Sequence, residues 1–273
     1  MRSSAIVGVA TLIGATSAAM SAEMLTIAAV DNADMVRMQE LTDDFAARNP
    51  GIHLNWVLLE ESVLRQKIST DIETRGGQFD IIAIGNYEVP IWARQGWLQP
   101  LDQLGDTYDE DDLLPAIRKA VSYRGKLYAS PFYGESAMLM YRTDLFRAAG
   151  LEMPPSPPWT FVREAALKLT DKVAGRYGMC LRGKAGWGEN MALLTAAANS
   201  FGARWFGFDW RPEFNSPEWK RTLEFYVDLL QTAGPPGSAF YGYPENLDLF
   251  RAGKCAMWID STVAASPPTD TKT

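Results

Sequence analysis

Histidine and cysteine, two residue types common in catalytic and metal sites, are scarce. The 273 residues include one histidine, His53, and two cysteines, Cys180 and Cys255. His53 lies on the polar side of an alternating segment, and no serine or cysteine motif accompanies it, so a nucleophilic triad is not indicated. Two cysteines carry no metal-binding or redox spacing. They can form a disulfide in an oxidising compartment or remain buried thiols, and the sequence leaves both alternatives open.

Basic residues are also fewer than acidic residues. The chain has 26 Lys and Arg against 33 Asp and Glu, a formal net charge of -7. An acidic surface disfavours nucleic acids and anionic membranes as partners, because both are negatively charged. The pair Gly76-Gly77 is too short for a phosphate loop, and the acidic run 109–112 lacks the alternating spacing of a calcium loop. We therefore expect neither a nucleic-acid partner nor a bound metal.

Long apolar runs are confined to the N-terminus. A short basic start precedes the uncharged run 5–19, and the small residues Ser21 and Ala22 come before the first acid, Glu23. This order is typical of a secretory signal peptide, and the run is shorter than the roughly 20 residues of a spanning helix. A buried N-terminal helix is the alternative. We expect a signal peptide over residues 1–22 and export of the rest of the chain.

The first half of the remaining chain alternates strand and helix patterns. The apolar runs 24–30 and 80–84 and the period-two segment 52–58 predict strands, the last run being typical of a parallel strand buried on both faces. Apolar residues at helical spacing predict helices over 35–45 and from residue 62 to 72. This order is typical of a doubly wound α/β lobe.

Polar residues follow two of these strands where each one ends. Asp31 and Asn32 come after the first strand, and Asn86 and Tyr87 come after the third. Ligands of such sheets bind beyond the carboxyl ends of the strands, so we expect all four side chains to be ligand-binding. Capping of the next helix is an equally good explanation for Asp31 and Asn32.

The second half has longer loops between its patterns. Segments 125–132, 137–141 and 255–259 predict strands, and Ser216-Pro217 predicts a helix start, with Ser as the cap and Pro at the first helical position.

Several short segments, taken in order, resemble those of the extracellular solute-binding proteins of ATP-driven sugar importers, the group that includes maltodextrin-binding proteins. No segment is specific alone, but their order is, and the resemblance extends over 23–266. Within the group, 201–206 and 257–266 are most similar to the sorbitol/mannitol branch. The matching segments are FDII (79–82), GWLQPL (96–101), GKLYASPF (125–132), YRTDLF (141–146), PWTF (158–161) and FRAGKCAMWI (250–259).

The resemblance implies an α/β, type II periplasmic binding protein fold. Its first lobe would cover 23–129 and its second lobe 130–266, with hinge strands between them. It also implies a non-enzymatic monomer in the periplasm that captures a polyol or sugar, with sorbitol or mannitol expected, and closes around it. Delivery to the transmembrane permease subunits of an ABC transporter would follow. No cofactor is implied.

Family members continue beyond the length of this chain. The final segment 267–273 is polar, contains Pro267 and Pro268, and has no apolar face, so it does not resemble a further core element. We therefore expect a C-terminally shortened form in which both lobes are incomplete.

Four further residues are candidates for ligand contacts, one of them through the resemblance. Glu135, by its offset from Tyr141, matches the ligand-contacting acid of the maltodextrin-binding relatives, and a carboxylate can accept two hydroxyl hydrogen bonds. Asp260 ends the strand 255–259 and would approach from the second lobe. In the glycine-containing segment 186–189, Glu189 is a further candidate, and Trp187 would stack on the ligand or pack in the core. We expect the largest contributions from Glu135 and Asp260.

A secreted glycosidase or polysaccharide lyase is the alternative function. A leader peptide and many aromatic residues also occur in such enzymes, and the paired acids of glycoside cleavage are defined by their separation in space.

Overall fold

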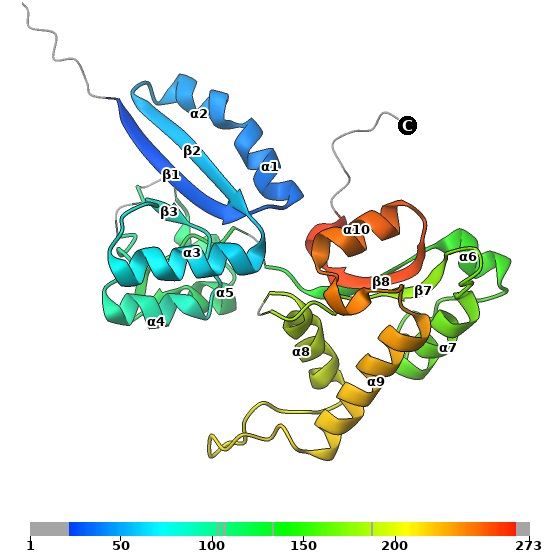
Figure 1. The fold of residues 1–273 in the computed structure, drawn as a ribbon. Helices are drawn as coiled ribbons and strands as arrows, with labels where there is room; N and C mark the ends of the chain where they lie inside the picture. Colours follow the sequence, from blue (N-terminus) through cyan, green and yellow to red (C-terminus); the bar gives the residue numbers. More distant parts are fainter. Residues whose placement is uncertain (1–21, 103, 106–107, 133, 187, 266–273) are drawn as a thin grey trace, which may run out of the picture.

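The computed structural model describes residues 22–102, 104–105, 108–132, 134–186 and 188–265. Its elements form two groups, each built on a three-stranded sheet (Figure 1). We call the elements from β1 to β5 the first lobe and those from β6 to η3 the second lobe. Over the described part of the chain, no helix has both the length and the apolar character needed to cross a membrane.

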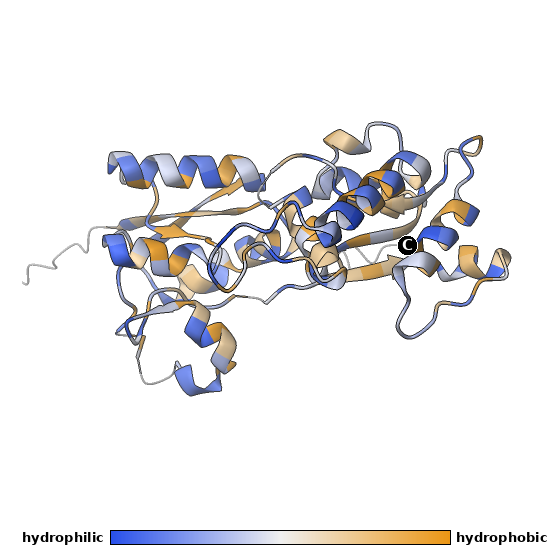
Figure 2. Ribbon diagram, turned by 90° about the horizontal axis from the view of Figure 1, so that it is seen from below, coloured by the Kyte–Doolittle hydropathy of each residue, from blue (hydrophilic) through white to orange (hydrophobic). Residues whose placement is uncertain are grey.

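The first lobe is built on a parallel sheet with the strand order β2-β1-β3. Helices α1 and α2 cover one side of it, and α3 and α4 lie on the other (Figures 1 and 2). A short hairpin, β4–β5, follows α5. The bounds are β1 (Glu23–Val30), α1 (Ala33–Glu40), α2 (Thr42–Arg48), β2 (Ile52–Leu59), α3 (Glu61–Thr74), β3 (Ile81–Ile82), α4 (Glu88–Gln95), η1 (Glu110–Asp112), α5 (Pro115–Ala120), β4 (Ser122–Tyr123) and β5 (Lys126–Leu127).

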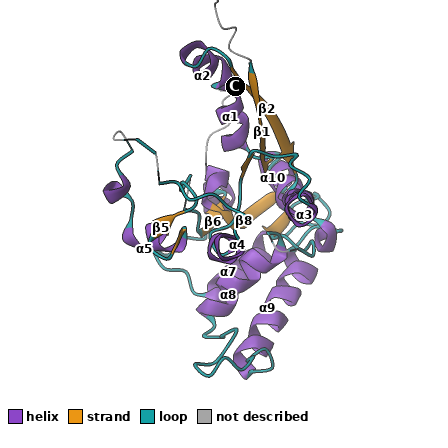
Figure 3. Cartoon of the chain, turned by 90° about the vertical axis from the view of Figure 1, so that its left-hand side faces the viewer, coloured by secondary structure: helices purple, strands orange, loops and turns teal. Residues whose placement is uncertain are grey.

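The second lobe is built on a mixed sheet with the order β6-β8-β7, in which β8 is antiparallel to β6 and parallel to β7. Helices α7, α8 and α9 lie on one side of this sheet, and α10 lies on the other (Figures 1 and 3). The bounds are β6 (Ala137–Tyr141), α6 (Thr143–Ala148), α7 (Trp159–Leu169), β7 (Tyr177–Cys180), α8 (Asn190–Ser200), α9 (Pro217–Ala233), η2 (Ser238–Phe240), α10 (Tyr243–Arg251), β8 (Cys255–Ser261) and η3 (Thr262–Ala265).

Two expectations for the first lobe are wrong in detail. The segment 80–84 forms only the two-residue strand β3 at the edge of the sheet, and Ile81 is 48% exposed because β1 flanks it on one side only. The helix expected over 35–45 is divided at Leu41 into α1 and α2. At this break the Thr42 hydroxyl donates to the Gln39 carbonyl (2.7 Å), so a side chain satisfies a carbonyl at the end of α1.

Other predicted elements are confirmed. Strands form at β1, β2, β6 and β8, and Ser216 caps α9 by accepting a hydrogen bond from the Trp219 N–H (3.3 Å). The register of the first two strands matters for function, because they pair along their full length, from Glu23 with Ile52 to Val30 with Leu59. Their carboxyl ends therefore coincide, and the residues that follow them leave the sheet side by side.

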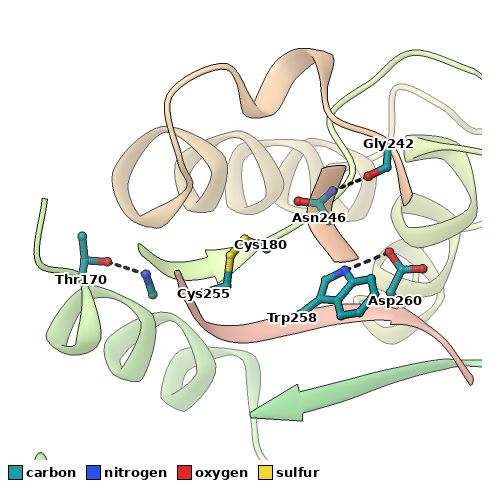
Figure 4. The surroundings of a disulfide bond; sticks show 8 residues. Thr170, Cys180, Gly242, Asn246, Cys255, Trp258 and Asp260 are labelled. Atoms are coloured by element: carbon teal, nitrogen blue, oxygen red, sulfur yellow. Dashed lines mark hydrogen bonds between the residues drawn. A yellow bond between two sulfur atoms is a disulfide. The ribbon is translucent and has the colours of Figure 1, made fainter. Parts of the chain in front are cut away.

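Cys180 and Cys255 form a disulfide bond. Cys180 ends β7, Cys255 begins β8, and both are fully buried with their Cα atoms 5.9 Å apart (Figure 4). The bond closes a loop with a sequence separation of 75. A cross-link of that length stabilises the folded state by about 4.5 kcal/mol through the lost entropy of the unfolded chain. It fixes the two strands whose ends carry the buried charges described next.

Candidate functional site

Side chains that follow strand ends connect the two lobes. Glu60 follows β2 of the first lobe, and its Oε1 accepts a hydrogen bond from the Lys184 Nζ of the second lobe (2.9 Å). Lys184 is also 3.4 Å from Glu189 Oε1, and the carboxyl groups of Glu60 and Glu189 are hydrogen-bonded to each other. We call these three residues the lobe junction.

Glu60 is held in place by the start of α3. Its side chain accepts a hydrogen bond from the Val63 N–H (3.3 Å), so Glu60 caps a helix that was expected to begin at Ser62. An acid is favoured there by the helix dipole. Burial alone would raise the pKa of Glu60, but hydrogen bonds with Lys184 and Glu189 lower it to about 2. Glu60 is therefore a carboxylate at neutral pH.

Glu189 is the buried member of the junction, with a side chain only 2% exposed. Burial raises the pKa of Glu189, and the hydrogen bond with Glu60 raises it further. The hydrogen bond with Glu60 raises the pKa of Lys184. The Lys184 ammonium lies beside both carboxyl groups.

Arg182 connects the junction to the sheet of the second lobe. Its Nε and Nη2 donate to the two oxygens of Asp260 (3.0 and 2.5 Å), and its Nη1 donates to the Gly188 carbonyl (2.6 Å). The guanidinium also lies 5.1 Å from the centre of the Tyr243 ring. Burial opposes its charge, but the hydrogen bonds and charge of Asp260 raise the pKa of Arg182 above its usual value. Arg182 thus fixes the loop that carries Lys184 and Glu189.

Asp260 has a different environment from the one expected of a ligand contact. It is completely buried, and besides Arg182 it accepts hydrogen bonds from the Trp258 Nε1 (3.0 Å, Figure 4) and from the Ser261 backbone N–H (2.7 Å). Both of its oxygens are therefore engaged within the protein. The structure gives Asp260 the role of a buried counter-ion, which the sequence did not indicate; its contact with a ligand stays a prediction.

Glu135 lies on the exposed side of the same network. Its Oε1 accepts a hydrogen bond from the Ser261 hydroxyl (2.9 Å). Partial loss of hydration raises the pKa of Glu135, although the Ser261 hydrogen bond and the charge of Arg182 oppose this. Three predicted site residues, Glu135, Glu189 and Asp260, are therefore brought together around Arg182.

The other predicted residues lie at the edge of the first lobe. Asn32 caps α1 by accepting from the Met35 N–H (2.9 Å), and Asp31 is exposed beside the end of β2, donating its N–H to the Leu59 carbonyl (2.8 Å). Asn86 is exposed in the turn before α4.

Tyr87 follows Asn86 in that turn and is 45% exposed. Loss of hydration and the charge of Glu88 raise the pKa of Tyr87 to about 12. Trp187 lies outside the described residues.

Three members of the site were missed by sequence reasoning: Glu60, Arg182 and Lys184. The rule applied to the first and third strands also selects Glu60, which directly follows the second strand. Arg182 follows β7, a strand that was not predicted because Gly178 interrupts its apolar run. A side chain at Gly178 would begin 1.7 Å from the Ala166 carbonyl oxygen, so α7 and β7 pack too closely for any other residue.

Neither of two cavities in the described structure coincides with this network. One of about 500 Å³ lies against the β4–β5 hairpin, near Asp102 and Lys126, and one of about 640 Å³ lies at the end of α9, near Leu230 and Phe240. Among the residues that the structure describes, no three His, Cys, Asp or Glu side chains are grouped to hold a metal ion. The chemistry of the site is therefore that of a charged, hydrogen-bonding surface between two lobes.

Comparison with known proteins gives a consistent set of relatives. Residues 30–272 match the family model of bacterial extracellular solute-binding proteins. The chain is 54% identical to a mannitol-binding protein of Pseudomonas aeruginosa over 252 residues, which are 92% of this chain and 58% of that protein.

Two solved structures extend the comparison. A solute-binding protein from Agrobacterium vitis with bound D-mannitol is 62% identical, with a TM-score of 0.86 over 90% of this chain and 59% of the other. One from Agrobacterium radiobacter in complex with ribitol is 26% identical, with a TM-score of 0.80 over 92% and 63%. The chain thus spans somewhat more than half the length of each of these relatives.

Proposed function

We propose that this chain, which belongs to the bacterial extracellular solute-binding proteins, captures a small polyol between its two lobes. Mannitol is the preferred ligand. The comparisons confirm the expected family, its sorbitol/mannitol branch and the type II α/β fold. One relative is a mannitol-binding protein, and another is the solute-binding protein of an ABC transporter.

The observation that carries the proposal is the polar network at the strand ends. Glu60 of the first lobe and Arg182, Lys184 and Glu189 of the second lobe meet there, and Glu135 borders them. Carboxylates and cations can exchange hydrogen bonds with the many hydroxyls of a polyol, and charged hydrogen bonds are the stronger ones. A ligand that touches both lobes would favour their closed arrangement.

Further parts of the proposal rest on the family. Residues 1–22 act as a signal peptide, the protein works in the periplasm as a monomer, and the loaded protein docks on the permease of an ABC transporter. The lobes divide near residue 130, and Asp31, Asn32, Asn86, Tyr87, Glu135, Trp187, Glu189 and Asp260 take part in binding.

Calorimetric titration of the chain from residue 23 onward tests this proposal. We expect binding of mannitol, weaker binding of ribitol and maltose, and no heat with amino acids. Tight binding to an amino acid alone, or turnover of a labelled oligosaccharide, would overturn it.

A further inference from the structure

The first turn of α3 lies directly against a loop of the second lobe. The start of α3 faces that lobe, and the loop it meets follows β7 (Figure 1). A Cβ at Gly188 of this loop would lie 2.3 Å from Glu61 Cγ, 3.0 Å from Glu61 Cδ and 3.4 Å from Glu61 Oε1. These three nearest atoms all belong to the first lobe. A side chain larger than hydrogen at position 188 therefore has no room while the lobes are in contact.

Gly186, two positions earlier, meets the same turn of α3. A Cβ there would lie 3.0 Å from Ser62 Oγ of the first lobe and 3.2 Å from Glu189 Cγ of its own lobe. Glycine is the residue that allows the closest approach of a backbone to another group. The loop thus presents two positions without side chains to the consecutive residues Glu61 and Ser62, directly beside the lobe junction.

The Glu61 side chain is held against Gly188 by its own lobe. Its Oε1 accepts a hydrogen bond from Arg65 Nε (2.8 Å). Arg65 in turn donates from Nη1 to Glu88 Oε2 (2.9 Å) and to the Ala83 carbonyl (3.1 Å). The side chains of Glu61 and Arg65 are only 20% and 18% exposed. Moving Glu61 away from Gly188 would break a partly buried ion pair, so this carboxylate is an obstacle that does not yield easily.

Gly188 is held in the second lobe in the same way. Its carbonyl accepts a hydrogen bond from Arg182 Nη1 (2.6 Å), and Arg182 is bonded to the buried Asp260. Each lobe therefore fixes its contacting segment through an arginine, Arg65 in the first lobe and Arg182 in the second. Because both segments are held, they can meet in only a narrow range of lobe arrangements.

We propose that Glu61 and Gly188 are positioning residues of ligand capture, which form a closure contact that raises ligand affinity without touching the ligand. The inference rests on the proposed function and adds to it the contact that limits how far the lobes close. A contact made only when the lobes are together raises the closed population. A ligand that binds the closed arrangement gains apparent affinity in proportion to that population.

Gly188→Ala tests the proposal, because the added methyl group keeps the lobes apart. Calorimetry on the full chain should show mannitol binding at least tenfold weaker than in the wild type. Small-angle scattering without ligand should show a larger radius of gyration. Gly207→Ala is the matched control in the same lobe: the nearest atoms to its Cβ would be the carboxyl groups of Asp209 and Glu213, in its own loop. This control should leave both quantities unchanged.

Removal of the obstacle should rescue the alanine variant. Glu61→Ala deletes the Cγ and Cδ atoms that a Cβ at position 188 would meet. The double variant, Glu61→Ala with Gly188→Ala, should bind mannitol within threefold of Glu61→Ala alone and regain the wild-type radius of gyration. A loop that is merely damaged by the substitution at 188 would not respond to a change on the opposite lobe. Rescue therefore distinguishes a closure contact from a purely structural role.

Ser62→Leu places the added bulk on the first lobe and serves if the variants at position 188 do not fold. It should weaken mannitol binding at least fivefold. Normal affinity in a folded Gly188→Ala or Ser62→Leu variant, or no rescue by Glu61→Ala, overturns the closure contact and leaves the proposed function standing. Failure of the wild type to bind mannitol overturns the proposed function, and the radii of gyration of the same variants then decide the closure contact on their own.

Discussion

The two lobes are stabilised by different interactions. The second lobe has a large core in which Phe146, Leu229 and Met257 are buried together, and a smaller cluster around Trp258 and the disulfide. It also contains the buried Arg182–Asp260 pair. The first lobe has two smaller clusters, one around Leu64 and one around the β4–β5 hairpin, and a two-residue strand at its sheet edge. The difference indicates that the second lobe is the rigid scaffold of the site, to which the first lobe contributes Glu60 and the residues that follow its strands.

Removal of the disulfide should have the largest effect and should act on the second lobe. We expect Cys180→Ser with Cys255→Ser to lower its free energy of unfolding by about 4.5 kcal/mol, because the unfolded chain regains the entropy of a loop spanning 75 positions. Denaturant unfolding followed by hydrogen exchange would separate the lobes. The double variant should be insensitive to reductant, and equal loss of protection in both lobes would contradict the division of roles.

Loss of the buried acid Asp260 should have the second-largest effect on stability. Asp260→Ala leaves Arg182 buried without its counter-ion, and we expect a destabilisation of about 4 kcal/mol in denaturant unfolding. The sequence-based interpretation of Asp260 as a ligand contact alone would instead predict a normal melting temperature and a loss of affinity. A normal melting temperature would therefore remove the buried counter-ion role from Asp260.

A core truncation in the first lobe should destabilise that lobe and not the second one. Ile68→Ala should cost about 3 kcal/mol because it empties a fully buried site on α3. Hydrogen exchange should show the loss in the first lobe only. If protection in the second lobe falls equally, the two lobes unfold as a single cooperative unit.

Glu135→Ala should separate binding from stability. Its carboxylate is exposed, so the melting temperature should change little, whereas mannitol affinity should fall by about 2 kcal/mol through loss of charged hydrogen bonds. Calorimetry and thermal unfolding of the same preparation measure both. Unchanged affinity would exclude Glu135 from the site.

The lobe junction should respond to acid. The pKa of Glu60 is about 2 in the folded protein, against an ordinary value of 4.5, so its contact is fully present above about pH 4.5 and is lost as pH falls toward 2. We expect the radius of gyration from small-angle scattering to rise over this interval.

Two lysine variants serve as controls for this acid response. Lys184→Met should remove the pH-dependent part of the change. Lys126→Met, which breaks an ion pair with Asp102 inside the first lobe, should leave it intact. A response that is the same in both variants would assign the expansion to general acid unfolding.

The limits of sequence reasoning also differ between the lobes. Periodicity and strand-end rules located most strands and helices of the first lobe, because its α/β order is local and regular. They missed the break at Leu41 and the short extent of β3, which depend on a hydroxyl–carbonyl hydrogen bond and on the position of a strand in the sheet. Strand β7, with its glycine, carries no apolar pattern long enough to recognise.

The candidate site shows the same limit. Glu135, Glu189 and Asp260 were identified and do lie near one another, but the partner that connects them, Arg182, is 78 residues from Asp260 in the chain. No spacing rule relates two residues that meet only when β7 and β8 pair. Family resemblance supplied Glu135 and a strand-end position supplied Asp260, but only the fold supplies their counter-ion.

The disulfide has one more consequence, which concerns the connectivity of the polypeptide. Helices α8, α9 and α10 all lie within the segment enclosed by Cys180 and Cys255. The loop between α8 and α9 lies there too, with Phe208 96% and Trp210 80% exposed. Exposed loops are the preferred sites of proteolytic cleavage. A cut in this loop would therefore leave two fragments that remain a single covalent molecule, with Arg182 on one fragment and Asp260 on the other.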